Sequence, residues 1–396
     1  MSEFHGLRPV ERVCGLPVSP MTKRRLNNFR ANRRGFWSLW IFLALFGLTL
    51  MAEVIANDEP ILVVHDGSLY FPIVQDYPET HWGGDLPTRA DYSDPFVQEL
   101  IAERGFMLMA PIPYDHRTVD WQLADPAPTA PDARHWLGTD DQARDVMART
   151  IYGLRISIIF GLTLTFFTTI IGVAAGAVQG YFGGWLDLIF QRLMEIFSTL
   201  PILMILIILA SMVEPSFWWL LFVMVLFGWP WPVGYVRAEF LRARNFDFVK
   251  AAKALGVSDR MVMFRHIMPN AMVATLTFLP FTLAGAITTL TALDFIGFGL
   301  PPGSASIGEL LAQGKANLHA PWLVLTGFIV LSVTLTLLFF IGEAVRDAFD
   351  PRKLFQSDYK PGEDAAETAA PASPASAPAP ATPARAPIGP QGGGGA

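Results

Sequence analysis

Residues 308–315 partly resemble a loop that binds the phosphate of a nucleotide. A phosphate-binding loop has four residues between its glycines and a Ser or Thr after its lysine. Here five residues separate Gly308 from Gly314, and Ala316 follows Lys315. The His-Glu-x-x-His and Gly-x-Ser-x-Gly patterns do not occur in the sequence, and the seven histidines show no clustering typical of a metal site. We therefore expect a chain that catalyses no reaction and binds no cofactor or metal itself.

A second group of residues suggests contact with another molecule. The segment 245–256 has an acidic helix N-cap, Asp247, and a glycine typical of a helix stop, Gly256. Ser258 would cap a second helix that ends at Pro269, because proline lacks a backbone donor. Two short helices joined at a glycine predict a rigid elbow, on whose backbone a groove of another protein could close. Three small side chains keep the surface of the elbow low: Ala251, Ala252 and Ala254.

The composition indicates that these motifs belong to a membrane protein. Of the 396 residues, 52% are hydrophobic and 16% are charged, whereas about a quarter are charged in a typical soluble protein. The mean hydropathy is +0.37. The single cysteine, Cys14, excludes a disulfide framework. The fold class that we predict is an all-α integral membrane protein.

Six apolar runs are candidates for membrane spans, since about 20 residues of helix cross the hydrocarbon core. The first is a retained helix, because the basic segment before it is long and no small-residue cleavage site follows it. Basic residues concentrate before the first run, between the fourth and fifth, and after the sixth, which predicts that both termini are cytoplasmic. The runs lie at residues 36–56, 156–178, 198–213, 217–236, 271–295 and 322–342.

The charge pattern divides the chain into segments. The part between the first two spans is acidic and rich in proline and aromatic residues, which predicts a small, irregular folded insert on the outer face of the membrane. The alanine- and proline-rich end has nothing to bury and predicts a disordered cytoplasmic tail. The predicted segments are a cytoplasmic N-terminal segment (1–35), a first transmembrane helix (36–56), a periplasmic insert (57–150), a five-helix core (151–350) with a cytoplasmic loop (237–270), and the tail (351–396).

The elbow resembles a known family motif. Lys250-Ala251-Ala252, then Gly256, then Ile267-Met268-Pro269 are similar to the EAA loop of permease subunits in binding-protein-dependent ABC importers, with Lys250 in place of the usual glutamate. In that family the short helix docks into a cleft of an ATPase subunit and transmits nucleotide-driven closure to the membrane spans. The resemblance implies the following ATPase-coupling residues: Asp247, Lys250, Ala251, Ala252, Gly256, Ile267 and Pro269.

Three further segments, 135–146, 295–302 and 342–352, resemble motifs of dipeptide and oligopeptide permeases. Together with the long insert they are most similar to the Yej-type group, whose importers carry peptides and microcin C. The resemblance implies a permease subunit of the bacterial inner membrane that passes peptides inward. Its implied partners are a homologous second permease, two ABC ATPase subunits or one fused ATPase that bind ATP and Mg²⁺, and a periplasmic peptide-binding protein.

Three other features have a structural and a functional interpretation. Gly172, Gly176 and Gly180 form a small-residue stripe, which favours close helix packing, although a moving seam in the substrate path is an alternative for Gly176. Arg192 and Glu195 are spaced for an ion pair between residues i and i+3 of a helix. Asp294, near the outer end of the fifth run, is a candidate for lining the substrate path, because ionisable residues inside a membrane are often functional.

Alternatives to the importer stay open at this point. The elbow is also consistent with a basic loop held by anionic membrane lipid. A DNA-binding helix-turn-helix is disfavoured because the basic residues surround both helices and no third helix completes the domain, so no nucleic-acid partner is expected. A self-sufficient ion-gradient-driven carrier is opposed by the shortage of mid-membrane charges and of a detectable inverted repeat. Nickel and glutathione are alternative substrates within the same family.

Overall fold

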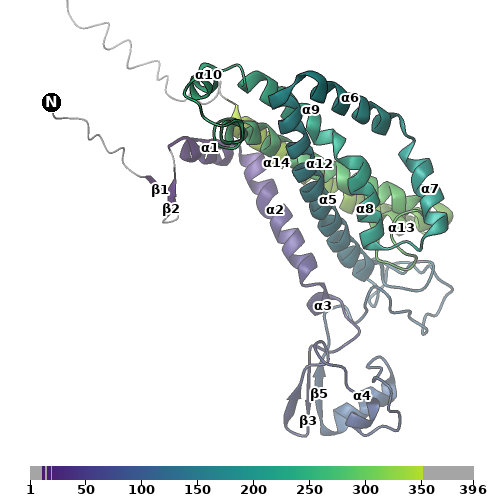
Figure 1. Cartoon of the computed structure of the whole chain (residues 1–396). Coiled ribbons are helices and arrows are strands. Elements are labelled where there is room, and N and C mark those ends of the chain that lie inside the picture. Colours follow the sequence, from purple (N-terminus) through teal and green to yellow (C-terminus); the bar gives the residue numbers. More distant parts are fainter. Residues whose placement is uncertain (1–10, 14–15, 19, 351–396) are drawn as a thin grey trace, which may run out of the picture. The chain divides into compact units, whose positions relative to one another are not determined.

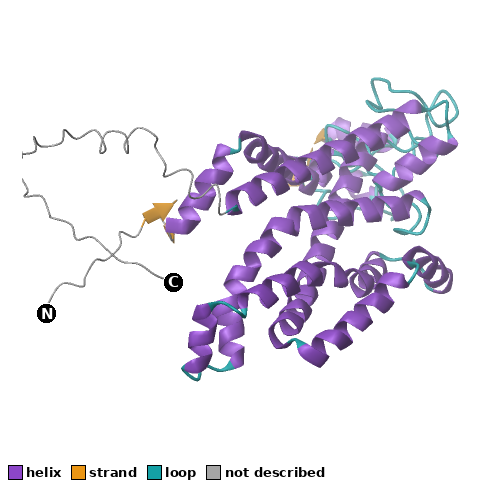
Figure 2. Ribbon diagram, turned by 90° about the horizontal axis from the view of Figure 1, so that it is seen from above, coloured by secondary structure: helices purple, strands orange, loops and turns teal. Residues whose placement is uncertain are grey.

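The computed structural model describes residues 11–13, 16–18 and 20–350 of the chain. Cys14, the predicted tail and the last residues of the 342–352 motif lie outside these ranges. Helix is the main secondary structure of the described part, and strands are few (Figure 2). The described part begins with β1 (Glu11–Val13), which pairs antiparallel with β2 (Leu16–Val18), and continues with α1 (Pro20–Ala31) and α2 (Arg33–Leu50). The short helix α3 (Ala52–Ile55) leads out of α2 (Figure 1).

Four helical stretches of the described residues are long and apolar enough to cross a membrane. They are α5 (Val146–Phe182), α8 with α9 (Phe217–Gly228 and Pro230–Ala243), the continuous stretch Asp259–Phe295 that ends in α12 (Met268–Phe295), and α14 (Pro321–Phe349). A bent pair, α6 (Gly184–Thr199) and α7 (Ile202–Met212), supplies a fifth candidate if it counts as one span. The described part is therefore a helical membrane domain.

A bend between α6 and α7 lies near the start of the predicted run 198–213. The two helices meet at 68°, with the break at Leu200 and Pro201. Leu200 has extended backbone angles (φ −72°, ψ 129°), as expected for a residue before proline, where the ring disfavours the helical conformation. Most of the predicted run 198–213 is α7, and the proline near its start separates α7 from α6.

The first apolar run, 36–56, is divided between two helices. α2 has 18 residues and begins with Arg33 and Arg34, and α3 has four residues. α2 packs along α14 and α5, with Phe42 buried beside Ile341 of α14. This helix therefore belongs to the same bundle as the long helices (Figure 1).

The small-residue stripe of α5 lies against α9. A Cβ atom added to Gly172 would lie 2.2 Å from Pro232 Cγ, and one added to Gly176 would lie 2.9 Å from Val236 Cβ. One added to Gly180 would lie 2.5 Å from Phe240 Cβ. The glycines therefore allow a close helix contact that larger residues would prevent.

Residues 57–150 contain a small sheet and the loops that lead into α5. β3 (Leu62–His65) lies between β4 (Ser68–Tyr70) and β5 (Gly105–Leu108), antiparallel to both, with Val63 opposite Tyr70 and Met107. The short helices η1 (Glu79–Trp82) and α4 (Pro95–Arg104) complete a cluster in which Val63 and Trp82 are buried. At the base of this unit, Tyr152 of α5 donates a hydrogen bond to the Ala56 carbonyl (3.1 Å).

The remaining helices lie between these long stretches. α10 (Asp247–Ala254), α11 (Asp259–Met261) and the π-helix η2 (Val262–Ile267) connect α9 with α12. α13 (Ile307–Ala316) lies between α12 and α14, and contacts both (Figure 1). The chain thus places the 237–270 segment at one end of the long helices and the 294–320 segment at the other.

We predict that Gly176→Leu destabilises the protein, because the added side chain must displace Val236 or separate α5 from α9. Overpacking of this kind typically costs about 1–3 kcal/mol. The amount of protein in the membrane and its thermal unfolding in detergent measure the effect. Gly285→Leu is the matched control, since Gly285 lies in α12 and a Cβ there meets nothing within 4 Å.

Equal stability of the two leucine variants would contradict tight packing at Gly176. A Gly176→Leu protein that is stable but transports nothing would favour the moving-seam interpretation instead.

Candidate functional site

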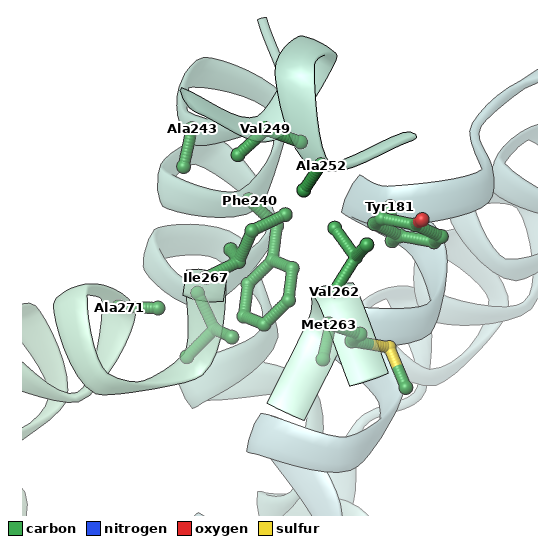
Figure 3. Close-up of a cluster of buried hydrophobic side chains, with 11 residues drawn as sticks. Tyr181, Phe240, Ala243, Val249, Ala252, Val262, Met263, Ile267 and Ala271 are labelled. Carbon is green, nitrogen blue, oxygen red and sulfur yellow. The ribbon is translucent and has the colours of Figure 1, made fainter. Parts of the chain in front are cut away.

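The elbow is built on a buried hydrophobic cluster (Figure 3). Val249 of α10 is fully buried, and Ala252 is 8% exposed. They pack with Phe240 of α9, Tyr181 of α5 and Val262 of η2. Ala271 of α12 belongs to the same cluster. Because four other helical elements pack against α10 in one cluster, they fix its orientation.

The turn after α10 matches its prediction. Gly256 has φ +79°, a left-handed conformation that favours glycine. Its N–H donates to the Lys253 carbonyl (3.0 Å), and the Val257 N–H donates to the Ala252 carbonyl (3.1 Å). These two bonds form the Schellman motif that ends a helix at glycine.

The beginning of α10 differs from the prediction by one residue. Phe246 occupies the N-cap position, and Asp247 is the first helical residue. The Asp247 side chain is fully exposed and lies 3.7 Å from Lys250 Nζ, so it caps no backbone N–H. A carboxylate in the first turn still interacts favourably with the positive end of the helix dipole. Lys250 is also exposed.

The second helix does not end at Pro269, so that prediction was wrong. α11 continues through the π-helix η2 into α12, and Pro269 lies in the first turn of α12. Proline is tolerated there because the wider π-turn precedes it and first-turn N–H groups need no partner within the helix. Ile267 is fully buried in the elbow cluster, and Pro269 is exposed. The elbow is thus continuous with a membrane-spanning helix.

Polar contacts join the elbow to the end of α5. The Tyr181 hydroxyl donates a hydrogen bond to Asp259. Lys253 Nζ lies 4.5 Å from the centre of the Tyr181 ring and 3.9 Å from Asp259 Oδ1. The elbow is therefore held to α5 by charge as well as by apolar packing.

The free surface of the elbow is more apolar than the alanines alone predict. Ala251 and Ala254 are exposed, but Ala252 faces the cluster, so the expectation that all three lie on the surface was wrong. The most exposed large apolar side chains on and beside α10 are Phe248 (45%), Leu255 (84%), Met261 (46%) and Phe264 (61%). We call these four residues the elbow apolar set.

At the opposite end of α5, a buried network of charges connects the 135–146 motif with α13. Arg149 is fully buried, and its Nη2 donates to Glu309 Oε2 (2.8 Å). Arg144 Nε donates to Asp140 Oδ2 (2.8 Å), and its Nη2 donates to Glu309 Oε1 (3.2 Å). The resemblance of the 135–146 motif gave these residues no role. Their charges beside apolar runs were a signal that could have predicted ion pairs, because charged side chains in such places are seldom unpaired.

His135 lies between two aspartates in the same region. Its Nδ1 is 2.8 Å from Asp145 Oδ2, and its Nε2 is 3.1 Å from Asp120 Oδ2. Asp145 also caps α5 by accepting a hydrogen bond from the Ala148 N–H (2.7 Å). Burial by itself lowers the pKa of His135, but the hydrogen bonds and charges of the two aspartates outweigh it and raise the pKa above its usual value.

Asp294 closes a turn at the C-terminal end of α12. Its Oδ1 accepts a hydrogen bond from the Leu300 N–H (2.7 Å), and its Oδ2 accepts one from the Ser306 hydroxyl (2.5 Å). A Cβ on Gly308 would lie 2.6 Å from Asp294 Cβ, so the chain packs closely against this carboxylate. The structure does not bring Asp294 together with Gly176 or with the elbow residues.

Two simpler expectations can also be compared with the structure. Arg192 and Glu195 of α6 form the predicted ion pair, and both are exposed. Within the described ranges no three His, Cys, Asp or Glu side chains are grouped so that they could hold a metal ion.

We predict that His135 stabilises the protein most at low pH. A raised folded pKa means that the stabilisation is complete below the unfolded pKa of about 6.5 and is lost as the pH rises through the folded value. The thermal unfolding midpoint of His135→Gln should therefore lie furthest below that of the wild type near pH 5–6, and the gap should narrow toward pH 9. His319→Gln is the control, because His319 is exposed.

A gap for His135→Gln that is constant or widens with pH would show that the imidazole does not carry the charge assigned to it.

Comparison with known proteins gives the family. A model described as "Binding-protein-dependent transport system inner membrane component" matches residues 150–354, just over half of the chain. The chain is 56% identical to the "Inner membrane ABC transporter permease protein YejE" of Escherichia coli K12, covering 85% of this chain and 98% of that protein. It is also 56% identical to the "Peptidoglycan transport system permease protein YejE" of Agrobacterium fabrum C58, covering 85% and 95%.

A more distant relative is the "Oligopeptide transport system permease protein OppC" of Haemophilus influenzae, 32% identical over 62% of this chain and 80% of that protein. The family match covers nearly all of the long helices, the elbow and the whole 342–352 motif, and the two relatives that align over 85% of the chain extend the similarity into the insert. The chain therefore belongs to the family of inner membrane components of binding-protein-dependent transport systems.

Proposed function

We propose that the chain is one of two permease subunits in an ABC importer of peptides. The names of its relatives support a peptide cargo, and two of them are called YejE. Its partners would be a homologous permease, two ABC ATPase subunits or one fused ATPase, and a periplasmic peptide-binding protein. The chain is non-catalytic in this proposal, and ATP and Mg²⁺ bind to the ATPases. Microcin C-like peptides belong to the proposed cargo.

The elbow is the observation that carries this proposal. α10 is locked to α5, α9 and α12 by the buried cluster, while the elbow apolar set stays exposed beside it. A rigid projection with large exposed apolar side chains suits a protein partner, because such anchors supply most of the binding energy at interfaces. A partner ATPase that closes on nucleotide can move the spans only through a contact that does not bend. The coupling residues Asp247, Lys250, Ala251, Ala252, Gly256, Ile267 and Pro269 either build this projection or lie on it.

The proposed topology has six spans, with both termini in the cytoplasm and residues 57–150 in the periplasm. The four long helical stretches and the bent pair supply five spans. α2 supplies the first, because its apolar residues pack along α14 while Arg33 and Arg34 mark its inner end. This arrangement puts the elbow on the same side as the N-terminal basic residues, as the positive-inside rule requires.

In this proposal the outer opening of the substrate path lies at the end of the long helices opposite the elbow. We propose that Asp294 lies near this opening. Both of its carboxylate oxygens bind within the 294–306 turn, so its contribution would be to shape the outer opening. Gly176 would act through the α5–α9 contact. An Asp294→Asn variant that imports peptide normally would remove Asp294 from the path.

Removing an apolar anchor from the elbow should release the ATPase. We predict that Leu255→Asp loses most of the ATPase that co-purifies with the tagged wild-type chain, because a charge cannot enter an apolar cleft without a partner. Mass spectrometry of the detergent-extracted complex measures it. Leu318→Asp is the matched control, since both leucines are 84% exposed but Leu318 lies in the loop between α13 and α14.

Retention of the ATPase by Leu255→Asp would contradict coupling through this surface. A wild-type chain that purifies alone in every detergent would favour the ion-gradient carrier. If the importer assembles but its binding protein delivers nickel or glutathione, the peptide cargo is wrong.

The Schellman turn gives a test of coupling that leaves the apolar set intact. We predict that Gly256→Val reaches the membrane but imports labelled peptide several-fold more slowly, since a β-branched residue is strained at φ +79°. Gly256→Asn is the control, because asparagine adopts left-handed angles at low cost. Equal uptake by the two variants would mean that the shape of this turn does not matter.

A further inference from the structure

A polar cavity of about 430 Å³ lies where α1 meets α2, beside the last turns of α14. Asn32 alone separates the two helices. Its Oδ1 accepts a hydrogen bond from the Gly35 N–H (3.3 Å), and its Nδ2 donates to Asp347 Oδ2 (3.4 Å), which ties the junction to α14. The cavity is lined by Ala31, Asn32, Arg33, Arg34, Phe340 and Glu343.

The walls of the cavity are fixed by backbone packing. A Cβ on Gly35 would lie 2.0 Å from Ala344 Cβ, so α2 and α14 approach closely next to the cavity. Gly35 and Ala344 are both buried. The relative position of the two walls therefore does not depend on the charged side chains at the opening.

The charges of the cavity are available to a ligand. Arg33, Arg34 and Glu343 are exposed, and none of them forms an ion pair with another described side chain. Two guanidinium groups lie on the α2 side, and one carboxylate lies on the α14 side. A ligand that satisfies both walls needs an anionic group and, close to it, a cationic group.

The surroundings place this cavity at a membrane boundary. Trp37 lies four residues after Arg33 and three after Arg34, so it is on the same face of α2, one turn further into the apolar run. Its side chain is 63% exposed. Tryptophan is enriched at membrane interfaces, where its ring sits at the level of the lipid headgroups. This step rests on the proposed first span.

We propose that this cavity binds the headgroup of an ethanolamine phospholipid from the cytoplasmic leaflet. The phosphate binds to Arg33 and Arg34, whose planar guanidinium groups match phosphate oxygens. The ammonium donates hydrogen bonds to Glu343. A purely anionic headgroup leaves Glu343 unpaired beside a phosphate, and a choline headgroup brings a cation that cannot donate a hydrogen bond. The acyl chains continue over the exposed surface of α2 at Trp37.

Native mass spectrometry of the purified chain in detergent tests the proposal. The probes are phosphatidylethanolamine, phosphatidylcholine and phosphatidylglycerol with identical acyl chains. The wild type should bind the ethanolamine lipid about tenfold more tightly than the choline lipid, as expected for a hydrogen bond between charged groups. Glu343→Gln should remove that preference. The double variant Arg33→Gln with Arg34→Gln should weaken binding of all three lipids.

The matched control removes two exposed arginines elsewhere. Arg104→Gln with Arg117→Gln changes the charge equally within residues 57–150 and should bind lipid as the wild type does. Equal binding of ethanolamine and choline lipids by the wild type would overturn the proposal. So would wild-type binding by the Arg33 and Arg34 double variant, or displacement of the lipid by inorganic phosphate at equal concentration.

The topology can fail separately from the lipid site. In a Cys14→Ser background, Ile41→Cys should be protected from a membrane-impermeant maleimide in intact membranes. Full labelling would show that the first span is wrong and would overturn the membrane placement of the cavity. Peptide import by the Gly256→Val variant tests the proposed function and affects neither the lipid-binding result nor the labelling result.

Discussion

The arrangement of the elbow end of the molecule depends on the burial of α10 against the ends of three other helices. Val249 and Ala252 are the residues through which this short helix is anchored, and Phe240 and Tyr181 form the surface that receives them. An eight-residue helix is not stable by itself in water, because helix nucleation is unfavourable and few bonds follow it. The packing of its apolar side, together with the glycine turn behind it, keeps it helical. Its other side is left free for a partner.

α5 joins this elbow to the outer end of the molecule. Its last turn carries Tyr181, its middle packs closely on α9 through Gly176, and its first turn carries Arg149. Each contact is of a different physical kind: apolar and cation–π at the inner end, close backbone approach in the middle, and buried ion pairs at the outer end. Removing one partner of a buried ion pair typically costs more than the pair contributes, so the outer contacts resist partial opening.

The sequence predicted the elements whose signals are local. Four of the six apolar runs, the glycine stop at Gly256 and the pair of Arg192 with Glu195 depend only on spacing along the chain, and the structure has them. The errors occur where the deciding partner is distant. Pro269 signalled a helix end, but a π-turn carries the helix past it, and Ala252 is buried because Phe240 and Tyr181 lie beneath it. The 135–146 motif was recognised, whereas its ionic contacts with Glu309 needed the three-dimensional structure.

The elbow and the segment around α13 are held by different interactions, which a change of conformation would affect differently. At the elbow, large apolar side chains stay exposed while the backbone beneath them is held by four helical elements, so this end suits transmission of an external force. At the outer end, Arg149, Arg144 and Glu309 connect α5 with α13, and Asp294 connects α12 with the segment before α13. A movement that enters at the elbow reaches α13 along α5 by one route and along α12 by the other. Both routes are continuous helices, because η2 joins the elbow directly to α12. The segment around α13 can then respond to the elbow without any flexible joint between them, provided that the helices move as rigid bodies.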